Sequence, residues 1–96
     1  MAKFKSYTDI RSLVSPDAYQ NALAFTSWHN RLSMTPMLEI PQALVVALAC
    51  EQHKLDGFLF SAVKTFLDEH RHAPMDTLES CRTLAAEMTA QLFQSA

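Results

Sequence analysis

Residues 43–50 read Ala-Leu-Val-Val-Ala-Leu-Ala-Cys, an unbroken apolar run that follows Pro41 and Gln42 and is closed by Glu51. As a helix the run covers about 12 Å, whereas a bilayer requires roughly 20 residues. A helix that is apolar on every side is normally buried in protein. The run therefore predicts a segment that is enclosed either by the rest of this domain or by another chain.

The totals favour one small domain that covers residues 1–96. An apolar content of 49% is ample for a core and argues against disorder. It is also high enough to favour self-association, because a core of this size hides only about 60–65% of the unfolded surface. The net charge of −2 lacks the basic excess that is typical of nucleic-acid binders.

The N-terminal residues and the cysteines indicate the cellular location that we expect for the protein. The first residues, Met-Ala-Lys-Phe-Lys-Ser-Tyr, contain no apolar signal segment. Cys50 and Cys81 are too few for a disulfide framework, and both lie among apolar residues. We therefore expect a soluble cytoplasmic protein with no membrane association.

The chain contains a single glycine and no Asn-Gly pair, whereas tight β-hairpins need such turns. Two of its four prolines follow good helix N-caps, in Ser15-Pro16 and Thr35-Pro36. We predict an all-α fold, a compact bundle of four to five short helices. The predicted segments are Ser6–Val14, Pro16–Leu32, Gln42–Leu55, Phe58–His70 and Thr77–Gln94.

Helix ends are predicted from residue spacing. Ser6 with Asp9, and Asp76 with Glu79, have the three-residue spacing of a capping box. Gly57 is predicted to cap the C-terminus of the third segment. The short stretch Pro36–Ile40 is predicted to form one helical turn, bent at Pro41.

Several large apolar residues exceed what single helix faces can bury. The three residues Phe58-Leu59-Phe60 cannot all face inward from one helix. We therefore interpret the chain as an interaction protein of the adaptor, inhibitor or regulatory-subunit type, whose partner is another protein or a second copy in a homodimer. The interface candidates are Trp28, Met34, Met37, Leu38, Phe58 and Phe60. The alternative is that these side chains cover the core beneath loops.

A second hypothesis is a small-ligand pocket between helices, with Tyr19 and His29 as its polar contacts. His29 lies in the middle of the apolar face of the second segment. Its simpler interpretation is a neutral core histidine that one hydrogen bond satisfies.

Other chemistry has little support. Cys50 and His53 have helical i, i+3 spacing, but a zinc site needs about four ligands, so we predict no metal and no cofactor. A helix-turn-helix around Gly57 would have only Lys64 and Arg71 as bases on its second helix, which makes nucleic acid an improbable partner. No nucleophile motif or phosphate-binding loop occurs, and we predict that the chain is not an enzyme.

Overall fold

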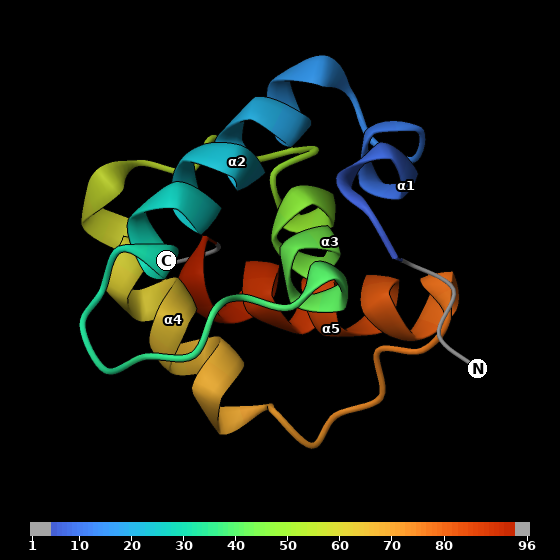
Figure 1. Ribbon diagram of the computed structural model, residues 1–96. Helices are drawn as coiled ribbons and strands as arrows, with labels where there is room; N and C mark the ends of the chain where they lie inside the picture. The colour runs from blue at the N-terminus through green and yellow to red at the C-terminus, as the bar shows by residue number, and fades with distance from the viewer. Residues whose placement is uncertain (1–4, 94–96) are drawn as a thin grey trace.

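The helices of the computed structural model account for most of residues 5–93, the part of the chain that the structure describes (Figure 1). No strand occurs within this range, which confirms the predicted all-α bundle. The elements are α1 (Tyr7–Arg11), α2 (Pro16–Asn30), α3 (Ile40–Ala49), the 3-10 helix η1 (Gly57–Leu59), α4 (Phe60–Glu69) and α5 (Leu78–Leu92).

Helix α3 carries the apolar run and lies at the centre of the molecule, with α5 crossing behind it in Figure 1. Every side chain from Ala43 to Ala47 is fully buried. Helices α1, α2 and α5 of the same chain contact α3. One copy of the chain therefore covers the centre of the run. None of the helices between residues 5 and 93 is both long and apolar enough to cross a membrane.

The helix starts follow the capping chemistry of the sequence. Ser15 accepts a hydrogen bond from the N–H of Ala18, and the carboxylate of Asp9 accepts one from the N–H of Ser6 at 3.3 Å. The predicted capping box of Asp76 and Glu79 is wrong by one residue, because the observed pair is Thr77 and Ser80. Thr77 is the N-cap of α5, because its extended backbone lets its hydroxyl accept the N–H of Ser80 at 3.0 Å.

The prediction for the third segment is wrong at both ends. Helix α3 starts at Ile40, and Pro41 occupies a position in its first turn where no N–H is needed. Residues 35–39 form an irregular connection rather than the predicted helical turn. The helix ends at Ala49, and residues 50–52 form a turn. Gly57 begins η1 and does not cap α3. The buried side chain of Leu55 holds the connection to the core.

The loop between α2 and α3 contains a strained residue. Met34 has φ 60, the left-handed region that favours glycine, and its side chain is fully exposed. The strain at this position is therefore not offset by packing within the chain.

We expect Met34→Gly to raise the free energy of unfolding by about 0.5–1 kcal/mol, since relief of the left-handed strain exceeds the added entropy of glycine in the unfolded chain. Urea denaturation measures the change. The matched control is Met37→Gly, in the same loop and also exposed but without positive φ, which should give no gain. Equal effects of the two substitutions would contradict this account.

Candidate functional site

Three of the predicted interface residues are exposed and lie in connecting segments. Phe58 is 88% exposed and Met37 is 72% exposed, while Met34 is fully exposed. Met34 and Met37 belong to the loop between α2 and α3, and Phe58 belongs to η1. In Figure 1 the start of α4 and the first part of the loop lie on the left side of the molecule, and the loop then runs to the start of α3 near the centre.

Leu38 does not belong to this exposed set. Its side chain is 7% exposed, and its N–H donates to Oδ1 of Asn30 at 2.8 Å. This bond ties the loop to the end of α2, so Leu38 turns into the core. Its prediction as an accessible interface residue is wrong, because the spacing of apolar residues in a loop does not show which of them the backbone turns inward.

Trp28 and Phe60 are half-buried and pack against each other, with ring centroids 5.4 Å apart. Phe25 lies beneath both rings, with centroids 5.8 Å from Trp28 and 5.6 Å from Phe60. This aromatic cluster joins the C-terminal half of α2 to the start of α4. Phe58, two residues before Phe60, lies outside the cluster because the 3-10 turn directs it away from the core.

Tyr19 and His29, the predicted contacts of one ligand pocket, line two different pockets. Tyr19 lies beside Arg11 and Gln20, whereas His29 lies beside Thr35 and residues of α4. Both belong to α2, and ten residues of helix separate them by about 15 Å along its axis. The prediction that they share one site is therefore wrong.

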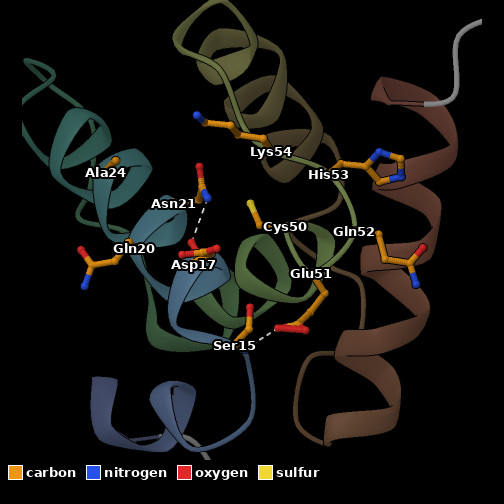
Figure 2. A pocket seen from close by; sticks show the side chains of 10 residues that line it. All are labelled: Ser15, Asp17, Gln20, Asn21, Ala24, Cys50, Glu51, Gln52, His53 and Lys54. Carbon is orange, nitrogen blue, oxygen red and sulfur yellow. Dashed lines mark hydrogen bonds between the residues drawn. The ribbon is translucent and has the colours of Figure 1, made fainter.

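The largest cavity is an open polar groove of about 560 Å³ between the start of α2 and the turn after α3 (Figure 2). The N–H of Ser15 donates to Glu51, which connects the two walls. Asn21 donates to the carbonyl of Asp17 at 2.8 Å, and Lys54 extends from the opposite wall. This groove is not predictable from local sequence patterns, because its two walls are about 30 residues apart in the chain.

The two cysteines are buried, and the pKa values of both thiols are raised. Burial raises the pKa of the Cys50 thiol to about 12, and the nearby Glu51 carboxylate adds to the effect. Burial, with Asp76 nearby, raises the pKa of Cys81 to about 11. Neither thiol is a nucleophile near pH 7. Within residues 5–93 no three metal-ligating side chains come together, and His53 instead stacks on Phe93.

These thiols predict a loss of stability in alkali. The folded-state pKa values lie above the ordinary 9.0, so their contribution is intact below pH 9 and is lost as pH rises towards 11–12. We expect each thiol to lower the free energy of unfolding by about 1 kcal/mol per pH unit above 9. Urea denaturation at pH 8, 9 and 10 should show a shallower decline in Cys50→Ala and Cys81→Ala. Identical slopes in all three proteins would refute the assignment.

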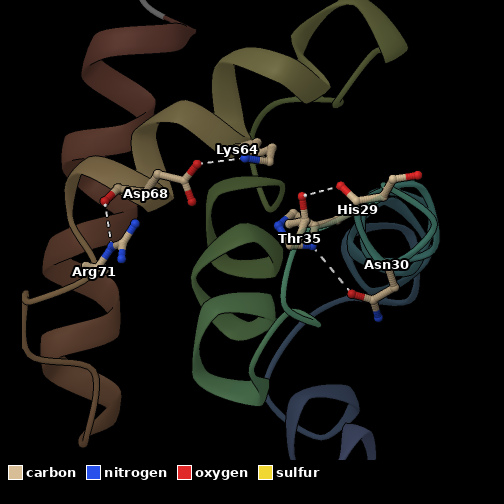
Figure 3. Close-up of polar contacts among 7 residues, drawn as sticks. His29, Asn30, Thr35, Lys64, Asp68 and Arg71 are labelled. Carbon is tan, nitrogen blue, oxygen red and sulfur yellow. Dashed lines mark hydrogen bonds and ion pairs between the residues drawn. The ribbon is translucent and has the colours of Figure 1, made fainter.

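His29 is 5% exposed and lies against a second pocket of about 280 Å³. The pocket is formed by the end of α2, by the connection into α3 and the first turn of α3, and by the end of α4 with the turn that follows it (Figure 3). Lys64 and Asp68 of α4 form an ion pair at 2.7 Å. Nε of Arg71, in the turn after α4, donates to the Asp68 carbonyl at 3.4 Å. Of the polar residues at this pocket, only His29 was predicted from the sequence as a ligand contact.

The two bases considered for a helix-turn-helix, Lys64 and Arg71, both bond to Asp68 of α4. Comparisons with family models, curated proteins and solved structures give no match to this chain.

Proposed function

We propose that this protein is an interaction module that associates with a second copy of itself through a surface centred on Phe58. The observation that carries the proposal is the 88% exposure of this phenylalanine in a chain that buries most of its other large apolar side chains. Exposed aromatic side chains are typical anchors of protein interfaces. Full burial of one such side chain contributes roughly 1.5–3 kcal/mol.

A second copy is the partner that the proposal requires, because a two-fold interface would bury Phe58 of both molecules at once. A standard interface covers about 800 Å² per partner, which is near one seventh of the 5932 Å² surface of this chain. Met34 and Met37 supply flexible apolar side chains that adapt to a facing surface. The small net charge of −2 imposes little repulsion between copies.

We expect Phe58→Glu to raise the dissociation constant of the dimer at least about tenfold, because it places a charge in the centre of the contact. Size-exclusion chromatography with light scattering across a dilution series measures the constant. Circular dichroism should show unchanged helicity, since Phe58 supports no packing in the monomer.

The control variant is Thr8→Glu, which adds the same charge at an exposed position of α1, away from η1 in Figure 1. It should associate like the unmodified protein. If Phe58→Glu and Thr8→Glu behave alike, the interface does not include Phe58. If the unmodified protein remains a monomer throughout the series, the proposed self-association is wrong.

A further inference from the structure

The side chain of His29 has one ring nitrogen that the fold itself does not use. Nδ1 lies 3.4 Å from Oδ1 of Asn30, and the same oxygen accepts the N–H of Leu38. Oδ1 is thus fixed as an acceptor, so the contact is a hydrogen bond only when Nδ1 carries the proton. In the neutral ring Nε2 then presents a lone pair and requires a donor.

Nε2 has no hydrogen-bond partner within residues 5–93. Every fully buried side-chain nitrogen or oxygen in that range does have a partner, so Nε2 is not fully buried. His29 is also one of the residues that line the pocket. A histidine that is about 95% buried beside a polar pocket, with an unpartnered ring nitrogen, is suited to recognise a donor group of a ligand.

Three charged residues line the pocket: Asp68 near the end of α4, Arg71 in the turn after it, and Glu39 at the N-cap of α3. One oxygen of Asp68 receives Lys64, which leaves the other oxygen to accept from a ligand. Nε of Arg71 is held by a backbone carbonyl, which leaves its terminal nitrogens to donate to a carboxylate. Thr35 adds a hydroxyl from the opposite wall. The pocket is thus lined both by oxygen acceptors that can bind a cation and by the guanidinium donors of Arg71, which can bind an anion.

We propose that this pocket binds a small zwitterion of the amino-acid class. The ligand ammonium donates to His29 Nε2 and Asp68, and the ligand carboxylate accepts from Arg71. A volume of about 280 Å³ is at the lower limit of ligand pockets, so it suits a molecule of roughly ten non-hydrogen atoms or fewer. Phe58 does not line this pocket, whereas Met37 does, and none of the ligand contacts assigned here involves Met37 or requires self-association.

The test is an NMR titration of the unmodified protein with glycine or L-serine, followed through the imidazole signals of His29. We expect saturable shifts with a dissociation constant on the order of 1–30 mM, as befits so small a ligand. Methylammonium and acetate are the single-charge probes, and each should bind at least about tenfold more weakly. Equal binding of either probe, or no saturable shift with glycine or serine, would overturn the proposal.

Variants of Asp68 and Arg71 test the assigned contacts without altering the buried histidine. Asp68→Asn and Arg71→Gln should each weaken binding about tenfold or more, because each removes a charged hydrogen bond. Glu69→Gln is the matched control, since Glu69 is exposed on α4 and does not line the pocket. Lys64→Gln shows whether loss of the ion pair alone explains the Asp68 result. Unchanged affinity in both Asp68→Asn and Arg71→Gln would contradict the assignment.

Discussion

We expect Phe25→Ala to lower the free energy of unfolding by about 3–5 kcal/mol, the largest effect of any substitution considered for this chain. Phe25 is 0% exposed and contacts the rings of Trp28, His29 and Phe60. Its removal leaves a cavity where α2 meets α4, and the rigid neighbouring rings cannot collapse into it. Urea denaturation followed by circular dichroism measures the loss, which is a large part of the roughly 5–15 kcal/mol typical of a domain.

The matched control is Phe58→Ala, which removes the same side chain from an exposed position. It should change the free energy of unfolding of the monomer by less than about 0.5 kcal/mol. Similar losses for Phe25→Ala and Phe58→Ala would mean that Phe58 packs against this chain. That result would also remove the main support for the proposed interface.

The second large effect is expected for Ala47→Leu, which should lower the free energy of unfolding by about 1–3 kcal/mol. Ala47 is fully buried in α3, so the added carbon atoms must displace side chains of the neighbouring helices. Ala86→Leu is the control, because Ala86 is exposed on α5. Alanine and leucine are both good helix formers, so the same substitution at an exposed site should have little effect on the helix. Thermal unfolding distinguishes the two variants. A stabilising Ala47→Leu would reveal unfilled space beside α3.

The fold class and the burial of α3 could be predicted because they depend on local patterns. The run from Ala43 to Ala47 has no polar face, and Ser15-Pro16 is a strong helix start. The end of α3 could not be predicted, since apolar periodicity extends through Leu55 while the backbone turns after Ala49. Leu55 is buried from a connection rather than from the helix, and periodicity does not distinguish these cases.

The candidate sites were harder to predict than the fold because they depend on contacts between distant segments. The excess of apolar residues at Phe58-Leu59-Phe60 pointed to an exposed aromatic, but not to which residue the 3-10 turn would direct outward. His29 was predicted as a ligand contact because it lies in the middle of the apolar face of α2. Asp68 and Arg71 lie about 40 residues further along, and nothing in their spacing connects them with His29.

The most direct test of the central claim is the mass of the unmodified protein by sedimentation equilibrium at two concentrations, one micromolar and one near millimolar. One copy already covers the centre of the apolar run of α3, so the claim is that the chain self-associates through another surface, the one around the exposed Phe58. The account predicts a mass of 10.8 kDa at the low concentration and a rise towards twice that value at the high one. A mass that stays at 10.8 kDa at both concentrations would contradict it.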